Sequence, residues 1–202
     1  VLLARGEAWR GGTPAALRVM SNVLAWARRP ERLRFHLLIE DHGHAIVAAA
    51  ADRAGLRVSL VNASDATLEA RLPPLGLAML RHTALQNKPR TYTAPKLWLH
   101  ALLPTDVPRA LVLDTDLLVL DDVCDAWDAF ARRCAAEPST LRGYAREQQP
   151  GYRTITANRT QGYNGGVGLQ HLQALRAATA GSAEWARALT SALDSKLLRR
   201  GG

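Results

Sequence analysis

The chain has 202 residues, of which 48% are hydrophobic and 22% charged, so we expect one globular domain with an apolar core and exclude a disordered chain. No run of about 18 apolar residues occurs, so the sequence holds no candidate membrane span. The formal net charge is +8, but arginines interspersed with acids supply most of the basic residues, and we expect no nucleic-acid partner.

In the first half of the chain, apolar runs alternate with helical patterns. Pro14 at the first helical position and Thr13 as its cap predict a helix start, and Gly55 predicts a helix end. Pro73-Pro74 is expected to end the last helix of this half. We expect strands at Val1–Ala4, Arg32–Ile39 and Leu56–Val61, and helices at Thr13–Arg28, Gly43–Ala54 and Asp65–Leu72.

The second half continues this alternation. We expect strands at Arg109–Leu113, Thr140–Tyr144 and Gly166–Gln170, and helices at Tyr92–Leu103, Asp121–Ala135, Leu172–Ala178 and Ser182–Leu198. Such an order is typical of an α/β domain with a mostly parallel, twisted sheet flanked by helices. Sheets of this kind bind ligands at the carboxyl ends of their strands.

Two aspartates follow an apolar run in the segment LVLDTDLLVL (111–120). Asp114 and Asp116 are two residues apart, and buried like charges this close require a positive charge between them. Mn²⁺ or Mg²⁺ takes one or two protein carboxylates and fills its other positions with phosphate oxygens. The pattern therefore indicates a metal site at Asp114 and Asp116. The alternative is that the pair only caps a turn before a helix.

Three glycines and a valine follow Asn164 in the segment GYNGGVG (162–168). Glycines let a backbone adopt positive φ and approach a ligand closely, and the Asn164 amide can both donate to hydroxyls and accept from them. The alternative is a plain hairpin turn, for which Asn-Gly is a common sequence.

Lys96 belongs to an apolar helical segment, Thr93–Trp98, that precedes the strand with the two aspartates. One interpretation is a cation that faces a diphosphate. The other is a surface lysine that packs its stem on apolar neighbours.

The order of these segments resembles glycosyltransferase family 8 over essentially the whole chain. The resemblance rests on Lys96, then LVLDTDLLVLDDV, then GYNGGVGLQHLQAL, with the family's spacing between Asp114 and Asn164. The stretch Gly143–Arg153 is most similar to the xyloside xylosyltransferases. The resemblance implies a GT-A nucleotide-diphospho-sugar transferase fold. It also implies a retaining enzyme that uses Mn²⁺ (or Mg²⁺) and a UDP-sugar, UDP-xylose or UDP-glucose, to glycosylate a sugar or glycoprotein acceptor.

The resemblance also implies roles for individual residues, although it assigns no catalytic residue and no oligomeric state. Asp114 and Asp116 would bind the metal, and Glu147 and Gln148 would lie on the acceptor side. The implied donor-binding residues are Leu3, Ala4, Arg5, Lys96, Asp114, Thr115, Asn164 and Gly165. If the protein is eukaryotic, the family's usual location and two Asn-x-Ser/Thr patterns, at Asn62 and Asn158, imply the lumen of the Golgi or endoplasmic reticulum, with a membrane anchor outside this fragment.

The sequence departs from the family pattern near its end. The family's third metal ligand, a His, and an Asp-Gln-Asp-like segment have no counterpart before Gly202. We therefore expect one glycosyltransferase domain over 1–202, truncated at the C-terminus and clipped at the N-terminus.

Two alternatives to an active transferase stay open. One is an inactive module that binds nucleotide sugar without turnover. The other is a haloacid-dehalogenase-like phosphatase with Asp114 as its nucleophile. Against the phosphatase, the aspartates do not open the domain, and Leu117-Leu118 stands where such enzymes have Thr or Ser.

Overall fold

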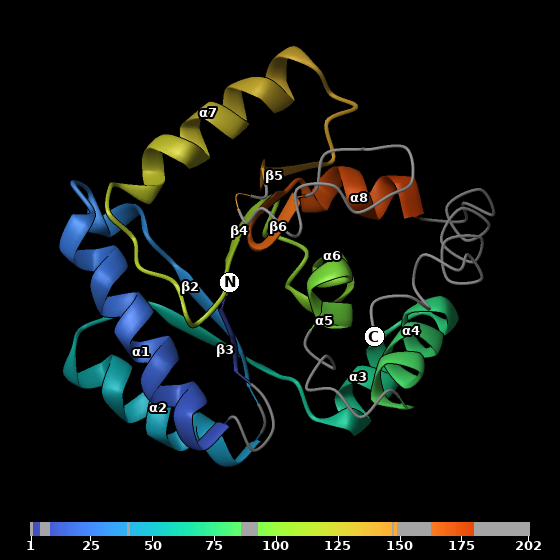
Figure 1. Ribbon diagram of the computed structural model, residues 1–202, viewed down its shortest axis with the longest axis horizontal. Coiled ribbons are helices and arrows are strands. Elements are labelled where there is room, and N and C mark those ends of the chain that lie inside the picture. The colour runs from blue at the N-terminus through green and yellow to red at the C-terminus, as the bar shows by residue number, and fades with distance from the viewer. Residues whose placement is uncertain are drawn as a thin grey trace.

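The structure, a computed structural model, describes residues 2–4, 9–39, 41–85, 93–146, 148 and 163–179. Its centre is a six-stranded sheet with the strand order β3-β2-β1-β4-β6-β5 (Figure 1). The strands are β1 (Leu2–Ala4), β2 (Phe35–Ile39), β3 (Val58–Asn62), β4 (Ala110–Leu113), β5 (Arg142–Arg146) and β6 (Tyr163–Gln170).

The expected mostly parallel sheet is confirmed. β1 to β4 run parallel to one another, whereas β6 is antiparallel to both of its neighbours, β4 and β5. Because β4 and β5 both oppose β6, they run in the same direction, and their carboxyl ends lie at the same edge of the sheet.

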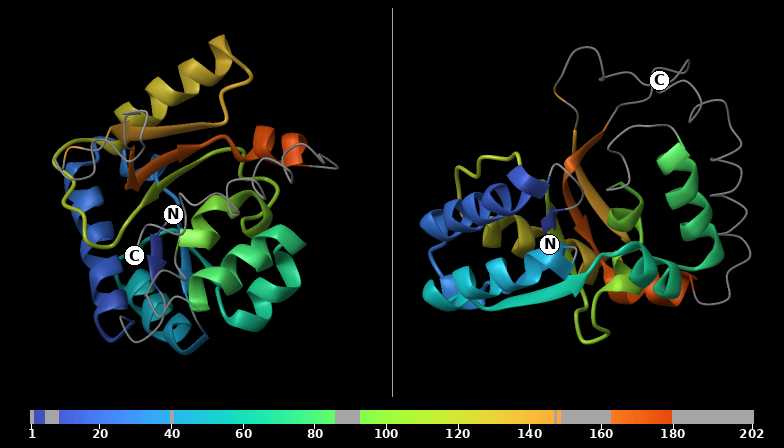
Figure 2. Two further views of the ribbon diagram at one scale, coloured as in Figure 1. Left: turned by 45° about the vertical axis from the view of Figure 1, so that its right-hand side comes forward. Right: turned by 90° about the horizontal axis from the view of Figure 1, so that it is seen from below.

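Helices cover both faces of this sheet, as the right-hand view of Figure 2 shows for α1 and α2 against α3 and α4. One face carries α1 (Trp9–Trp26), α2 (Asp41–Arg53) and α7 (Val123–Ala136). The other face carries α3 (Asp65–Arg71), α4 (Pro74–Leu85), α5 (Thr93–Leu97), α6 (Leu99–Leu102) and α8 (Leu172–Thr179).

Alternation along the strands divides the core into two layers. Leu37 and Ile39 of β2 pack with α1 and α2. Leu38 of β2 and Val112 of β4 pack into the opposite layer, with Leu99 of α6 and other residues of α3, α4, α5 and α8. Within the described residues, no helix has the length and apolar character that crossing a membrane requires.

Some expected boundaries are wrong. Helix α1 begins at Trp9 rather than Thr13, and Pro74 is the first residue of α4, an element that we did not expect. Proline suits this first position because its missing N–H would have no partner there. The helix expected over 92–103 is broken at Trp98, whose buried ring packs so close to Gly76 that an added Cβ would lie 3.1 Å away. The helix expected at 182–198 lies outside the described residues.

Helix α7 is attached to the end of α1 by charged side chains. Its N-cap, Asp122, accepts hydrogen bonds from the backbone N–H groups of Cys124 (2.9 Å) and Arg28 (3.1 Å). Arg28 also pairs with Asp125, and Arg32 forms a two-pronged pair with Asp128. These contacts hold in place the far end of the loop that leaves β4.

Candidate active site

The site lies at the sheet edge where β1 and β4 end and β6 begins. Leu2 of β1 pairs with Leu113 of β4, so the next residues, Leu3 and Ala4, are level with Asp114 and Thr115. The structure therefore brings the first strand and the segment that begins at Asp114 to the same edge of the sheet. Thr115 is half-buried in the turn that follows β4.

Lys96 reaches this edge from α5. Its Nζ forms an ion pair with Oδ1 of Asp114 and lies 3.4 Å from the carbonyl oxygen of Gly165. The Lys96 side chain is only 17% exposed, so the interpretation as a surface lysine is wrong. Lys96 instead places a positive charge against the first of the two aspartates.

Asn164 and Gly166 hold the other side of Asp114. The backbone N–H of Asp114 donates to the Gly166 carbonyl (2.9 Å), and the N–H of Gly166 donates to Oδ1 of Asn164 (2.7 Å). Since the Asn164 oxygen is used in this way, its amide NH₂ is the group that can donate to a ligand.

The glycines of this segment serve close approach rather than a turn. They lie inside β6, so the hairpin interpretation is wrong, and among the described glycines positive φ is found at Gly55. A Cβ at Gly166 would lie 3.0 Å from Oδ1 of Asn164 and 3.2 Å from Oδ2 of Asp114. Any side chain at this position would therefore push these two groups apart by a few tenths of an ångström.

A cavity of about 280 Å³ opens beside Lys96, between α5 and strands β4, β5 and β6. From β6, the cavity is lined by Asn164, Gly165, Gly168 and Gln170. The two glycines add no side chain of their own to the space on this side of the strand. Tyr144 of β5 occupies part of that space, since a Cβ at Gly168 would lie 2.9 Å from its ring.

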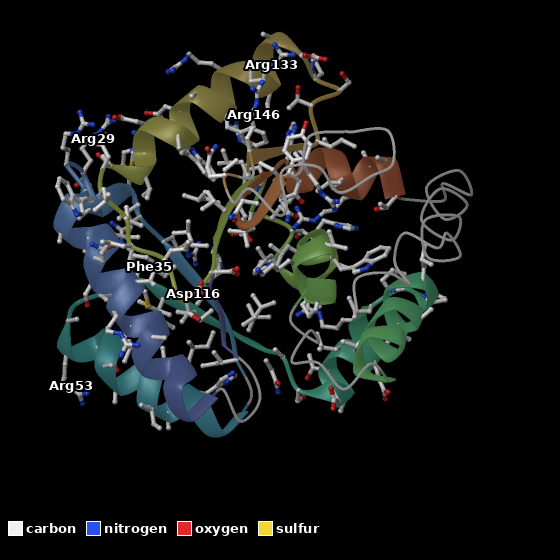
Figure 3. The ribbon with its side chains drawn as sticks, in the orientation of Figure 1. Arg29, Phe35, Arg53, Asp116, Arg133 and Arg146 are labelled. Carbon is white, nitrogen blue, oxygen red and sulfur yellow. The ribbon has the colours of Figure 1, made fainter. Side chains whose placement is uncertain are left out.

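The two aspartates suit a hard divalent cation. Asp116 is exposed in the turn after β4 (Figure 3), and the loop beyond it is held to α1, where the Val119 N–H donates to Asn22. Among the described residues, no group of three His, Cys, Asp or Glu side chains forms a complete metal site. Two carboxylates with substrate oxygens as the remaining ligands are what Mg²⁺ and Mn²⁺ commonly accept.

Some of the other predicted site residues lie outside the part of the chain that the structure describes. Arg5 and Glu147 are outside the described residues, and for Leu3 and Ala4 the structure gives the strand but not the side chains. Gln148 is exposed just past β5, where its Nε2 donates to the Arg146 carbonyl (3.3 Å). β5 and β4 end at the same edge of the sheet, so Gln148, two residues after β5, lies on the side of the sheet where the site is.

Sequence reasoning missed Tyr144 and Gln170, which line the cavity, and Arg142, which binds the backbone of Leu97 in its wall. Arg142 and Gln170 donate to carbonyls at the end of α5, and Gln170 is 1% exposed. The period-two spacing from Asn164 could have placed Gln170 on the cavity face. Its contact with a helix some 70 residues earlier in the chain carries no such signal.

Two solved structures of glycosyltransferases share this fold. The apo crystal structure of mouse xyloside xylosyltransferase 1 is 22% identical and superposes with a TM-score of 0.62 over 98% of this chain and 72% of its own. The galactosyltransferase LgtC, solved with donor and acceptor sugar analogues, is 20% identical, with a TM-score of 0.57 over 98% of this chain and 68% of its own.

These likenesses show that the chain has a GT-A glycosyltransferase fold, as the sequence predicted. No family model matches the sequence, and no curated protein matches it at a significant level.

Proposed function

We propose that this chain is a retaining glycosyltransferase that binds a UDP-sugar, either UDP-xylose or UDP-glucose, and transfers the sugar to a glycan or glycoprotein. The observation that carries the proposal is the convergence of Asp114, Lys96 and Asn164 at Gly165 and Gly166, at the carboxyl edge of a GT-A sheet. The likeness to two glycosyltransferases supports sugar transfer over the phosphatase alternative.

The chemistry needs stabilisation of the leaving diphosphate. Asp114 and Asp116 would hold Mn²⁺, which when bound supplies Lewis-acid stabilisation of phosphate charge. Lys96 already places its ammonium group at this edge and would add a second positive charge facing the donor phosphates. The NH₂ group of Asn164 would donate to a hydroxyl of the donor sugar, which would lie in the cavity beside β6.

Calorimetric titration of UDP with and without Mn²⁺ tests this proposal. We expect Mn²⁺-dependent UDP binding in the wild type and its loss in Asp116→Ala, because one of the two carboxylate ligands is gone. Asp52→Ala, which removes an exposed carboxylate on α2, is the matched control and should bind as the wild type does. Equal UDP affinity in Asp116→Ala and the wild type would contradict the metal assignment.

Hydrolysis of UDP-xylose, UDP-glucose and UDP-galactose in the presence of Mn²⁺ then tests turnover and donor choice. Measurable release of UDP from one of the first two supports the transferase. UDP binding without hydrolysis or transfer would instead favour the inactive nucleotide-sugar-binding module.

A further inference from the structure

The helix that carries Lys96 is short and ends abruptly. Helix α5 has five residues, and Trp98 separates it from α6, which begins at Leu99. A helix leaves its last carbonyl groups without helical donors, so partners must come from elsewhere. A helix of this length also has little stability of its own. The position of Lys96 therefore depends on what binds the end of α5.

Two neighbouring residues of the sheet supply these partners. Gln170 of β6 donates from Nε2 to the carbonyl oxygen of Lys96 (2.7 Å), and Arg142 of β5 donates from Nη2 to that of Leu97 (2.8 Å). Gln170 and Arg142 are direct partners in the β5–β6 register. One cross-strand pair thus binds two consecutive carbonyls at the C-terminal end of α5.

The burial and polarity of Gln170 favour a specific role over generic packing. Its side chain is almost wholly buried, and its Oε1 is unpaired among the described residues, so the bond from Nε2 to Lys96 fixes the orientation of the amide. A buried amide that leaves its oxygen unpaired is costly compared with an apolar side chain of the same size.

We infer that Gln170 and Arg142 are positioning residues that hold the backbone of Lys96 so that its ammonium group meets Asp114. The flexible four-carbon stem of a lysine does not fix the ammonium group by itself, so the backbone of Lys96 has to be held for the charge to stay at Asp114. Loss of the Gln170 bond would release the end of α5 and separate Nζ from the carboxylate. The consequence for ligand binding rests on the proposed function, whereas the positioning itself does not.

Carbon-13 NMR of reductively dimethylated lysines tests the positioning without any nucleotide. The chain has only three lysines, Lys88, Lys96 and Lys196. The Lys96→Arg variant identifies the Lys96 resonance, and Asp114→Asn gives its position without the ion pair. We expect Gln170→Met, which keeps the side-chain volume but cannot donate, to move the resonance at least half of the way to that position.

The matched control is Gln173→Met on α8, whose side chain is exposed, and it should leave the Lys96 resonance in place. If circular dichroism shows that Gln170→Met does not fold, the same measurement is made on Arg142→Met, which removes the bond to Leu97 and should move the Lys96 resonance in the same direction. A Lys96 resonance at its wild-type position in the folded variant overturns the inference.

A double-mutant cycle on UDP affinity tests whether Gln170 acts through Lys96. We expect Gln170→Met to weaken UDP binding about tenfold in the wild type and less than about twofold in a Lys96→Met background. An equal loss in both backgrounds would show a general structural effect and overturn the inference. If the wild type binds no UDP, the proposed function fails, and the NMR result alone decides the positioning.

Discussion

Replacing Gly166 with alanine tests whether UDP binding depends on the close approach of Asn164 and Asp114 to the backbone at this position. The new Cβ would lie 3.0 Å from Oδ1 of Asn164 and 3.2 Å from Oδ2 of Asp114, so each oxygen has to move by a few tenths of an ångström. Oδ1 of Asn164 already accepts from the Gly166 N–H at 2.7 Å. Its displacement therefore weakens a hydrogen bond worth about 1 kcal/mol.

Part of this loss is offset, because alanine has less freedom than glycine in the unfolded chain, by roughly 0.4–1 kcal/mol. We therefore expect little change in the free energy of unfolding but about a tenfold loss of Mn²⁺-dependent UDP affinity. The affinity falls because the displaced carboxylate and amide are proposed ligand groups. Gly143→Ala in β5 is the matched control, since its Cβ would make only an ordinary contact with Phe130 at 3.5 Å.

Calorimetric titration of Gly166→Ala and Gly143→Ala measures their UDP affinity. Urea unfolding of the same variants measures their free energy of unfolding, so a loss of binding is distinguished from a loss of stability. The explanation would be refuted if Gly166→Ala bound UDP as the wild type does. It would also be refuted if Gly143→Ala, with unchanged stability, lost the same affinity.

Two further predictions concern stability. Burial lowers the pKa of His36 and of His100 from 6.5 to about 4, so the unfolded chain binds more protons between these values. Stability should therefore fall as the pH drops from 6.5 towards 4, by on the order of 3 kcal/mol for each histidine, and His36→Leu should flatten a urea-unfolding profile across this range. Asp122→Ala should lower the melting temperature by several degrees, because α7 loses its N-cap, whereas Asp122→Asn, which can still cap, should lower it less. Equal melting temperatures for these two variants would contradict the capping role.

The sequence predicts the edge of the sheet well because its signals are local. An apolar run that ends in Asp114 and Asp116 specifies a buried strand with carboxylates at its carboxyl end, and β4 has this form. Gly55 adopts the positive φ expected of a residue that ends a helix. These features depend on neighbours in the chain, so a pattern can report them.

Features that depend on distant contacts were not predicted. The break at Trp98 follows from the packing of its ring against Gly76 in another helix. The glycines after Asn164 resemble a turn locally, but pairing with β4 and β5 draws them into a strand. Likewise, the ion pair of Lys96 with Asp114 joins residues whose proximity only the folded sheet creates.

The attachment of α7 to the end of α1 has a part that dissolved salt can weaken and a buried part that it cannot. Arg28 and Asp125 are more than half exposed, so dissolved ions reach their pair readily. Screening shortens from about 10 Å at 0.1 M to about 3 Å at 1 M, and exposed pairs of this kind are weak to begin with. Concentrated salt would thus weaken the Arg28–Asp125 pair at the far end of the loop that carries Asp116, whereas the cap at Asp122, whose side chain is 2% exposed, would stay in place.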